Sequence, residues 1–226
     1  MAIHSWKSAR DAARNAGRPI PAIRRLVGAS TALLVVDMQR AFLDVGAAIE
    51  VPDGRELVQG INILATRLRR AGGVVVFFRY VVGDDPGLLA TFESRSYIDP
   101  KRESPLRALS RGHPQFEIHP ELQVRRGDIV MEKVRYSAVL GSPIVEILRR
   151  RRVTNAIVTG VTTDVCAGNT AECLMQSGFR TVVAWDGTAA LSRLTHELSL
   201  ARMFCLYADV MPISEIVSRV RPVGGQ

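Results

Sequence analysis

The chain has 226 residues, of which 47% are hydrophobic and 23% charged. This composition, with a mean hydropathy of +0.09, excludes an intrinsically disordered chain and is sufficient for one sizeable core. The longest apolar runs, such as 32–36 and 74–78, are far shorter than the roughly 20 residues that cross a bilayer, so we expect no membrane-spanning segment. Three cysteines cannot form a disulfide framework and indicate a reducing compartment.

A formal net charge of +8 raises the question of nucleic acid binding. Much of the excess lies in scattered arginine pairs, and the dense run 149–152 falls where we expect the carboxyl end of a helix. Cations there complement the helix dipole. Because the sequence has no lysine-rich tail, zinc-finger spacing or interleaving of aromatic and basic residues, we expect no nucleic acid partner.

Residues 1–30 are rich in alanine and arginine, and prolines interrupt them at positions 19 and 21. They contain no apolar stretch of the kind found in secretory signals, so we expect none there. We interpret 1–30 as an N-terminal arm that packs on the body or on a partner subunit, and 31–226 as a single domain. Together with the free cysteines, this favours a cytoplasmic location.

From residue 31 onward, short apolar runs alternate with segments of helical period, a pattern typical of a parallel sheet with crossover helices. The alternation predicts strands at 31–36, 73–79, 128–132, 154–159, 181–185 and 204–209. It predicts helices at 54–71, 142–151, 165–177 and 192–203. The fold class is therefore α/β. Residues 80–127 carry many prolines and glycines and are expected to form short helical pieces and loops over the active-site edge.

Ligands bind beyond the carboxyl ends of parallel strands, so the residues that follow each apolar run are the candidates for chemistry. Asp37, Lys133 and Cys166 stand there, after the first, third and fourth strands. Singly, each has a structural explanation, as a turn former, a solvated cation or a buried apolar thiol. Together, a thiol at a helix start, a cation that favours thiolate and a carboxylate that carries protons form a hydrolytic set.

The remaining cysteines and histidines are given structural roles. Cys173 lies two helical turns after Cys166, and Cys205 lies inside the last predicted strand, so we expect both in the core. His113 and His119 each precede a proline and follow no predicted strand. We expect them at the surface or in loops, and we expect no metal site.

Three stretches resemble the isochorismatase-like cysteine hydrolases, a family that includes nicotinamidases, N-carbamoylsarcosine amidohydrolases and ureidoacrylate hydrolases. They are ALLVVDMQRAFL at 32–43, KVRYSA at 133–138 and VTGVTTDVC at 158–166. The similarity extends over about 31–215. We therefore expect a three-layer α-β-α sandwich with a six-stranded, mainly parallel Rossmann-like sheet, in the strand order 3-2-1-4-5-6.

The resemblance implies roles for individual residues. Cys166 would be the nucleophile, Asp37 the proton shuttle, and Lys133 the cation that orients Asp37 and favours thiolate. A cis peptide bond between Val161 and Thr162 would aim the amide of Thr162, with that of Cys166, at the oxyanion. The family also implies a homo-oligomer, either a dimer or a tetramer. No cofactor is implied.

Departures from the family pattern narrow the substrate. Nicotinamidases hold a metal through an Asp-x-His after the second strand, but this chain reads FFRYVVGDDPG there. We therefore expect a small linear amide, carbamoyl or ureido substrate. Two alternatives remain: vinyl ether hydrolysis of the isochorismatase type, in which Cys166 is incidental, and a non-catalytic scaffold.

Four residues are candidates for substrate contact. Phe42 matches an aromatic pocket wall in the family, with ordinary core packing as the alternative. Arg79, Arg135 and Tyr136, with Tyr80, lie near the carboxyl ends of strands and could bind a carboxylate or carbonyl. An arginine there could equally pair with a loop acid, such as those at positions 84 and 85.

Overall fold

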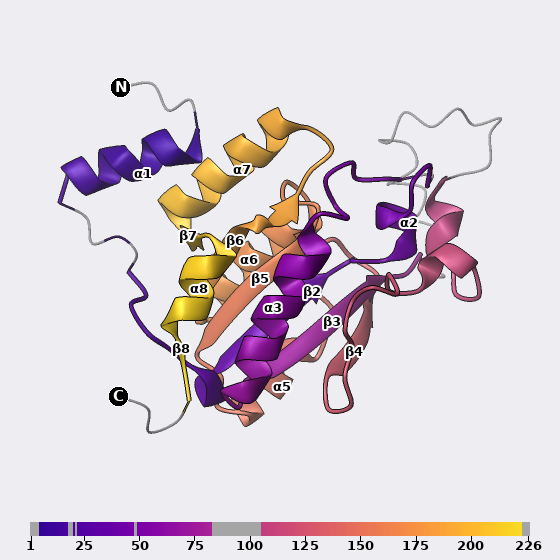
Figure 1. Cartoon of the computed structure of the whole chain (residues 1–226), viewed down its shortest axis with the longest axis horizontal. Helices are drawn as coiled ribbons and strands as arrows, with labels where there is room; N and C mark the ends of the chain where they lie inside the picture. Colours follow the sequence, from indigo (N-terminus) through magenta and orange to yellow (C-terminus); the bar gives the residue numbers. More distant parts are fainter. Residues whose placement is uncertain (1–4, 18–19, 21, 48, 83–104, 223–226) are drawn as a thin grey trace.

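A parallel sheet of six strands forms the centre of the protein (Figure 1). The structure is a computed structural model that describes residues 5–17, 20, 22–47, 49–82 and 105–222. Every strand pair in the sheet is parallel. The strands are β2 (Thr31–Val36), β3 (Val74–Tyr80), β4 (Ile129–Lys133), β5 (Asn155–Val161), β6 (Arg180–Ala189) and β7 (Asp209–Met211).

The strand order is β4-β3-β2-β5-β6-β7. Counted from β2, this sequence of strands reads 3-2-1-4-5-6, because the labels run one higher than in the predicted sheet. The difference in labels arises from the two-residue strand β1 (Leu26–Val27), which pairs with β8 (Val220–Arg221) outside the main sheet. The predicted fold class, an α/β sandwich with a mainly parallel sheet, is confirmed.

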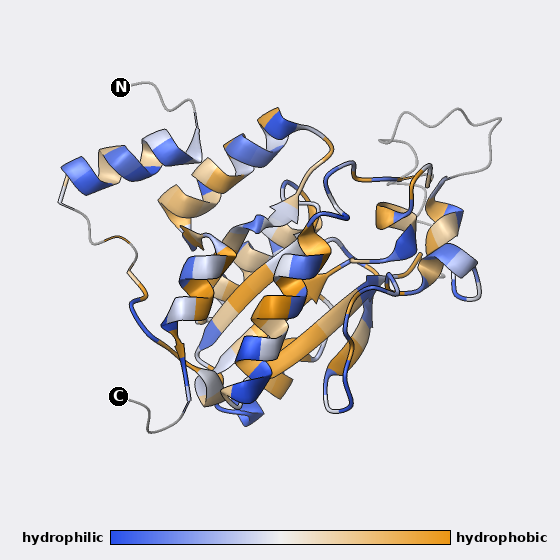
Figure 2. Ribbon diagram, in the orientation of Figure 1, coloured by the Kyte–Doolittle hydropathy of each residue, from blue (hydrophilic) through white to orange (hydrophobic). Residues whose placement is uncertain are grey.

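Helices cover both faces of the sheet, and the alternation of strand side chains explains why. Alternate residues of β2 enter different cores. Leu34 belongs to the cluster that includes residues of α5 (Ile144–Arg150), α6 (Cys166–Gln176) and α7 (Arg193–Leu206), whereas Leu33 belongs to the cluster that includes residues of α3 (Leu57–Arg70) and α8 (Ile213–Arg219). All six residues of β2 are buried, as expected for a central strand covered on both faces. The strands are accordingly coloured as apolar along most of their length in Figure 2.

The N-terminal segment packs on its own chain in the described part. Helix α1 (Trp6–Asn15) lies against α7 (Figure 1), and the ring of Trp6 meets that of Trp185 at 5.8 Å between centroids. Farther on, the carboxylate of Asp209 accepts hydrogen bonds from the amides of Ala22 and Ile23, at 3.1 and 2.7 Å. The described part of the arm therefore packs on the body of its own chain.

Short helices complete the described part of the chain. They are η1 (Gly28–Ser30), α2 (Arg40–Leu43), η2 (Pro105–Leu109) and η3 (Pro114–Phe116). The last two lie in the irregular segment predicted at 80–127, of which 83–104 lies outside the described residues. No helix in the described ranges is long and apolar enough to cross a membrane.

The strand predicted at 204–209 is wrong at its start. Helix α7 continues to Leu206, and the strand begins at Asp209. The apolar run there belongs to the last turn of a helix: Phe204 is buried, whereas Cys205 and Leu206 face solvent. Cys205 is therefore exposed rather than in the core, and Cys173 is only partly buried.

Candidate active site

Asp37 follows the central strand β2 and is fully buried. Its amide donates to the carbonyl of Phe78 in β3 at 3.0 Å, and its φ of 54° turns the chain sharply away from the sheet. Gly160 on the neighbouring strand β5 permits this close approach: a Cβ there would lie 2.0 Å from the carbonyl oxygen of Val36, and its own φ is 102°. The carboxylate thus sits at the carboxyl edge of the sheet.

Lys133 is the last residue of β4 and is 3% exposed. Its Nζ lies 2.7 Å from Oδ2 of Asp37 and donates to the carbonyl of Arg135 at 3.1 Å. The ammonium also stands over the ring of Tyr80, its register partner on β3, at 4.3 Å from the centroid. This cation–π contact and the ion pair hold the ammonium in place.

Cys166 begins α6, immediately after the turn that follows β5, and is 7% exposed. Its thiol lies within hydrogen-bonding reach of both the Asp37 carboxylate and the Lys133 ammonium. The carbonyl of Cys166 accepts from the hydroxyl of Thr170 at 2.7 Å, and that hydroxyl accepts from the amide of Ala138 at 3.0 Å. Thr170 therefore ties the helix of the thiol to the loop beyond Lys133.

Burial dominates the electrostatics of these three groups. It raises the pKa of the Cys166 thiol, and the nearby Asp37 adds to this shift while Lys133 opposes it. Burial also raises the pKa of Asp37 against the influence of Lys133. For Lys133, burial lowers the pKa, but the Asp37 carboxylate and the Cys166 sulfur outweigh it and the pKa is raised. The resting thiol is therefore protonated, next to a carboxylate that can accept its proton.

The segment 162–166 presents two unused amide groups. In the described part of the chain, the amides of Thr162 and Cys166 donate no hydrogen bond, whereas those of Thr163, Val165 and Ala167 each have an acceptor. Cys166 is the first residue of α6, and Thr162 lies four residues before it. The peptide bond between Val161 and Thr162 is cis.

The four residues expected to contact substrate have different surroundings. Tyr136 is 39% exposed; burial raises the pKa of its hydroxyl, and the nearby sulfur of Cys166 adds to the shift. Its ring lies 6.4 Å from that of Tyr80. Arg135 is exposed beside it. Phe42 is partly buried and packs against two clusters of the core.

Arg79 is occupied by acids. It pairs with Glu117 at 2.8 Å and with Glu132 at 3.1 Å, and its guanidinium covers the ring of Phe116 at 4.6 Å. Arg79 therefore forms structural ion pairs, the alternative considered for it, with these two glutamates as its partners. The acids at 84 and 85, which were the expected partners, lie outside the described residues.

Gln39 contributes to the site without a signal in the sequence. Its buried amide donates to the carbonyls of Tyr80 and Phe116 at 3.1 and 2.7 Å and accepts from the amide of Tyr80 at 2.7 Å. Gln39 thus links the end of β3 and the short helix η3 to the segment that follows Asp37. Gln39 and Thr170 each make hydrogen bonds to residues that are distant in sequence, so no local pattern could have revealed these roles.

The histidines divide between surface and interior. His113 is exposed, as expected, whereas His119 is 6% exposed, and its amide donates to the carbonyl of Met38 at 2.9 Å. His119 thus lies in a loop, one of the two expected places, but it is buried there rather than at the surface. Within the described ranges, no three side chains of histidine, cysteine, aspartate or glutamate are grouped to hold a metal.

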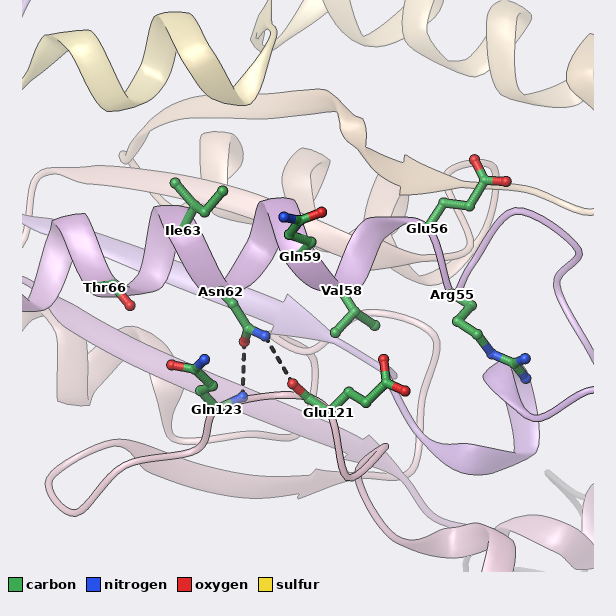
Figure 3. A pocket seen from close by; sticks show the side chains of 9 residues that line it. All are labelled: Arg55, Glu56, Val58, Gln59, Asn62, Ile63, Thr66, Glu121 and Gln123. Atoms are coloured by element: carbon green, nitrogen blue, oxygen red, sulfur yellow. Dashed lines mark hydrogen bonds between the residues drawn. The ribbon is translucent and has the colours of Figure 1, made fainter.

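A hollow of about 580 Å³ lies away from these groups, between α3 and the segment 121–123 (Figure 3). The amide of Asn62 crosses it, donating to the carbonyl of Glu121 at 2.8 Å and accepting from the amide of Gln123 at 2.9 Å. None of the expected site residues lines it. The lining residues are Arg55, Glu56, Val58, Gln59, Asn62, Ile63, Thr66, Glu121 and Gln123.

A buried thiol, carboxylate and ammonium lie together at the carboxyl edge of the parallel sheet. The protein is therefore of the α/β class in which the functional site lies at that edge. Residues 31–215 match the isochorismatase domain family. The chain therefore belongs to the isochorismatase domain family.

Known proteins similar to this chain include amidohydrolases. It is 28% identical over 221 residues to the ureidoacrylate amidohydrolase RutB of Pseudomonas syringae pv. syringae (strain B728a), an alignment that covers 92% of this chain and 89% of the relative. A cysteine hydrolase from Pseudomonas syringae pv. phaseolicola 1448A has a similar fold, with a TM-score of 0.78 at 24% identity, over 89% of this chain and 98% of that one. The N-carbamoylsarcosine amidase of Thermoplasma acidophilum has a TM-score of 0.66 at 24% identity, over 81% and 96%.

Proposed function

We propose that the protein is a cysteine hydrolase that cleaves the C–N bond of a small linear amide, carbamoyl or ureido compound through a covalent intermediate on Cys166. The observation that carries this proposal is the buried set of Asp37, Lys133 and Cys166, with 2.7 Å between the ammonium and the carboxylate. Family membership and the amidohydrolase names among its relatives support the same reaction class.

The first half of the reaction follows from the protonation states. The resting thiol carries its proton, so Asp37 accepts that proton as the sulfur attacks the carbonyl carbon. The carbonyl π bond opens to an oxyanion, which the free amides of Thr162 and Cys166 bind. Asp37 then donates the proton to the departing nitrogen, the C–N bond breaks, and the amine leaves.

The second half regenerates the thiol. Water attacks the thioester or thiocarbamate carbon, and Asp37 takes the proton from the water. The tetrahedral oxyanion is again held by the two amides. When the C–S bond breaks, the proton returns to the sulfur and the acid product leaves. Lys133 keeps Asp37 oriented throughout and stabilises negative charge on the sulfur.

The substrate class rests on fewer observations. We infer that Tyr136, which is partly exposed near the sulfur, contacts a polar group of the substrate and that the exposed Arg135 beside it binds a carboxylate. Ureidoacrylate is one candidate substrate, because the relative RutB is named as a ureidoacrylate amidohydrolase. A homo-oligomer remains an expectation from the family resemblance.

A substrate panel tests the proposal. Ammonia release is measured with ureidoacrylate, an N-carbamoyl amino acid and maleamate, with nicotinamide as the cyclic comparison and pyruvate release from isochorismate as the vinyl ether comparison. We expect turnover of at least one linear compound, lost in Cys166→Ala. Pyruvate release that survives Cys166→Ala would instead support the vinyl ether hydrolase.

A further inference from the structure

Thr163 lies in the segment between the two free amides and is fully buried. Its amide donates to the carbonyl of Ala189 at 2.8 Å. Its carbonyl faces Gly168, where a Cβ would lie 2.6 Å from that oxygen. The backbone of Thr163 is thus held from β6 and from α6, one residue after the amide of Thr162.

The side chain of Thr163 is held from a third element. Its Oγ1 lies 2.8 Å from Nδ1 of His196, in the first turns of α7. In the described part of the structure, Nδ1 is the one acceptor within reach of this buried hydroxyl proton. We therefore assign the hydroxyl as the donor to Nδ1, an assignment that puts the imidazole proton on Nε2.

We propose that His196 is a positioning residue that fixes Thr163 and, through it, the amide of Thr162 toward the oxyanion. The inference rests on the proposed cysteine hydrolase function. It assigns to α7, which supplies no member of the Asp37, Lys133 and Cys166 set, a part in stabilising the transition state. A donor amide contributes fully only if it is aimed at the oxyanion before the charge develops.

The surroundings keep the imidazole neutral. Burial lowers the pKa of His196, while the carboxylates of Glu197, Asp53 and Asp164 oppose this shift. A hollow of about 330 Å³ on this side also presents Glu56, Asp186 and Arg193. Protonation of Nδ1 would remove the acceptor from the Thr163 hydroxyl, so acid should weaken the connection.

Four variants test the connection in the full-length protein. His196→Leu and Thr163→Val remove it from either end, and the double variant removes both ends. His196→Asn retains an acceptor oxygen near the position of Nδ1. His113→Leu is the matched control, because it removes an exposed histidine that accepts one local hydrogen bond from Gln115.

Kinetics on the best compound of the panel measure the effect. We expect His196→Leu and Thr163→Val each to lower kcat by about 5- to 20-fold, as for one lost buried hydrogen bond, with KM within about twofold. The double variant should be no worse than either single one, since both remove the same bond. His196→Asn should recover most of kcat, and His113→Leu should retain all of it. Additive losses in the double variant, or a changed KM with an unchanged kcat, would overturn the inference.

Hydrogen–deuterium exchange provides a readout that is independent of turnover. We expect faster amide exchange in a peptide spanning 160–167 for His196→Leu and Thr163→Val, and native exchange for His196→Asn. Unchanged exchange in both disrupted variants refutes the positioning role. Absence of turnover by the native protein across the panel would count against the proposed function, and the exchange data would still decide the role of His196.

Discussion

The ion pair between Lys133 and Asp37 predicts a large and pH-dependent loss of stability when the lysine is removed. The two side chains are 1% and 0% exposed, and the charged atoms are 2.7 Å apart. Lys133→Met leaves the carboxylate buried without its countercharge, a change that costs about 3–5 kcal/mol in the free energy of unfolding. At roughly 2–4 °C per kcal/mol for a chain of this size, the melting temperature should fall by about 6–20 °C.

The pH dependence of this loss has a definite sign. Burial already raises the pKa of Asp37 above 3.8, and Lys133 is the main opposing influence. Without Lys133 the pKa of Asp37 rises further in the folded state only, so the variant is penalised increasingly as the pH rises above about 4. Thermal unfolding of both proteins between pH 5 and 8 should therefore show the smaller difference at pH 5.

A neutral pair provides the control. Asp37→Asn combined with Lys133→Met leaves no buried charge and should recover most of the stability that Lys133→Met loses, although neither protein should turn over substrate. An unchanged melting temperature in Lys133→Met, or a loss that is independent of pH, would refute the reasoning.

Three further variants test other parts of the structure. Asp37→Asn cannot accept the thiol proton, so we expect the single-turnover rate of acylation to fall by about 10²–10⁴-fold; an unchanged rate would exclude Asp37 as the base. Gln39→Leu removes three buried hydrogen bonds and should lower the free energy of unfolding by about 3 kcal/mol in urea titrations, whereas a change below about 1 kcal/mol would contradict the role of Gln39. Gly160→Ala should lower it by at least about 2 kcal/mol, because the Cβ meets the carbonyl oxygen of Val36 and the φ is positive; native-like stability would show that the strand ends can separate.

The sheet could be predicted from the sequence because its central strands, β2 and β5, are buried on both faces. A run such as Ala32 to Val36 is apolar at every position. A surface helix would show polar residues on one side, so a short run without them favours a buried strand. The error at 204–209 has the converse cause. Phe204 and Cys205 are adjacent apolar residues at a helix end, where one is buried and the other exposed, and a short apolar run does not distinguish these cases.

The convergence of side chains at the sheet edge was predictable where a residue follows a strand directly. Asp37 and Lys133 each come at the end of a parallel strand, so a sheet of this topology brings them to one edge. The contact between Thr163 and His196 joins residues 33 positions apart through the packing of α7, and no periodicity encodes it. Arg79 shows a different limit of sequence-based prediction. Its position at a strand end suggested a contact with substrate, but its guanidinium forms ion pairs with two glutamates.

The covalent intermediate is the central claim, and intact-protein mass spectrometry after rapid acid quenching tests it most directly. During turnover of the best compound of the panel, the account predicts a mass increase equal to the acyl or carbamoyl group, located by peptide mapping on Cys166 and absent in Cys166→Ala, with Cys205 unmodified. Steady turnover with no adduct on Cys166, or with full activity in Cys166→Ala, would contradict the account.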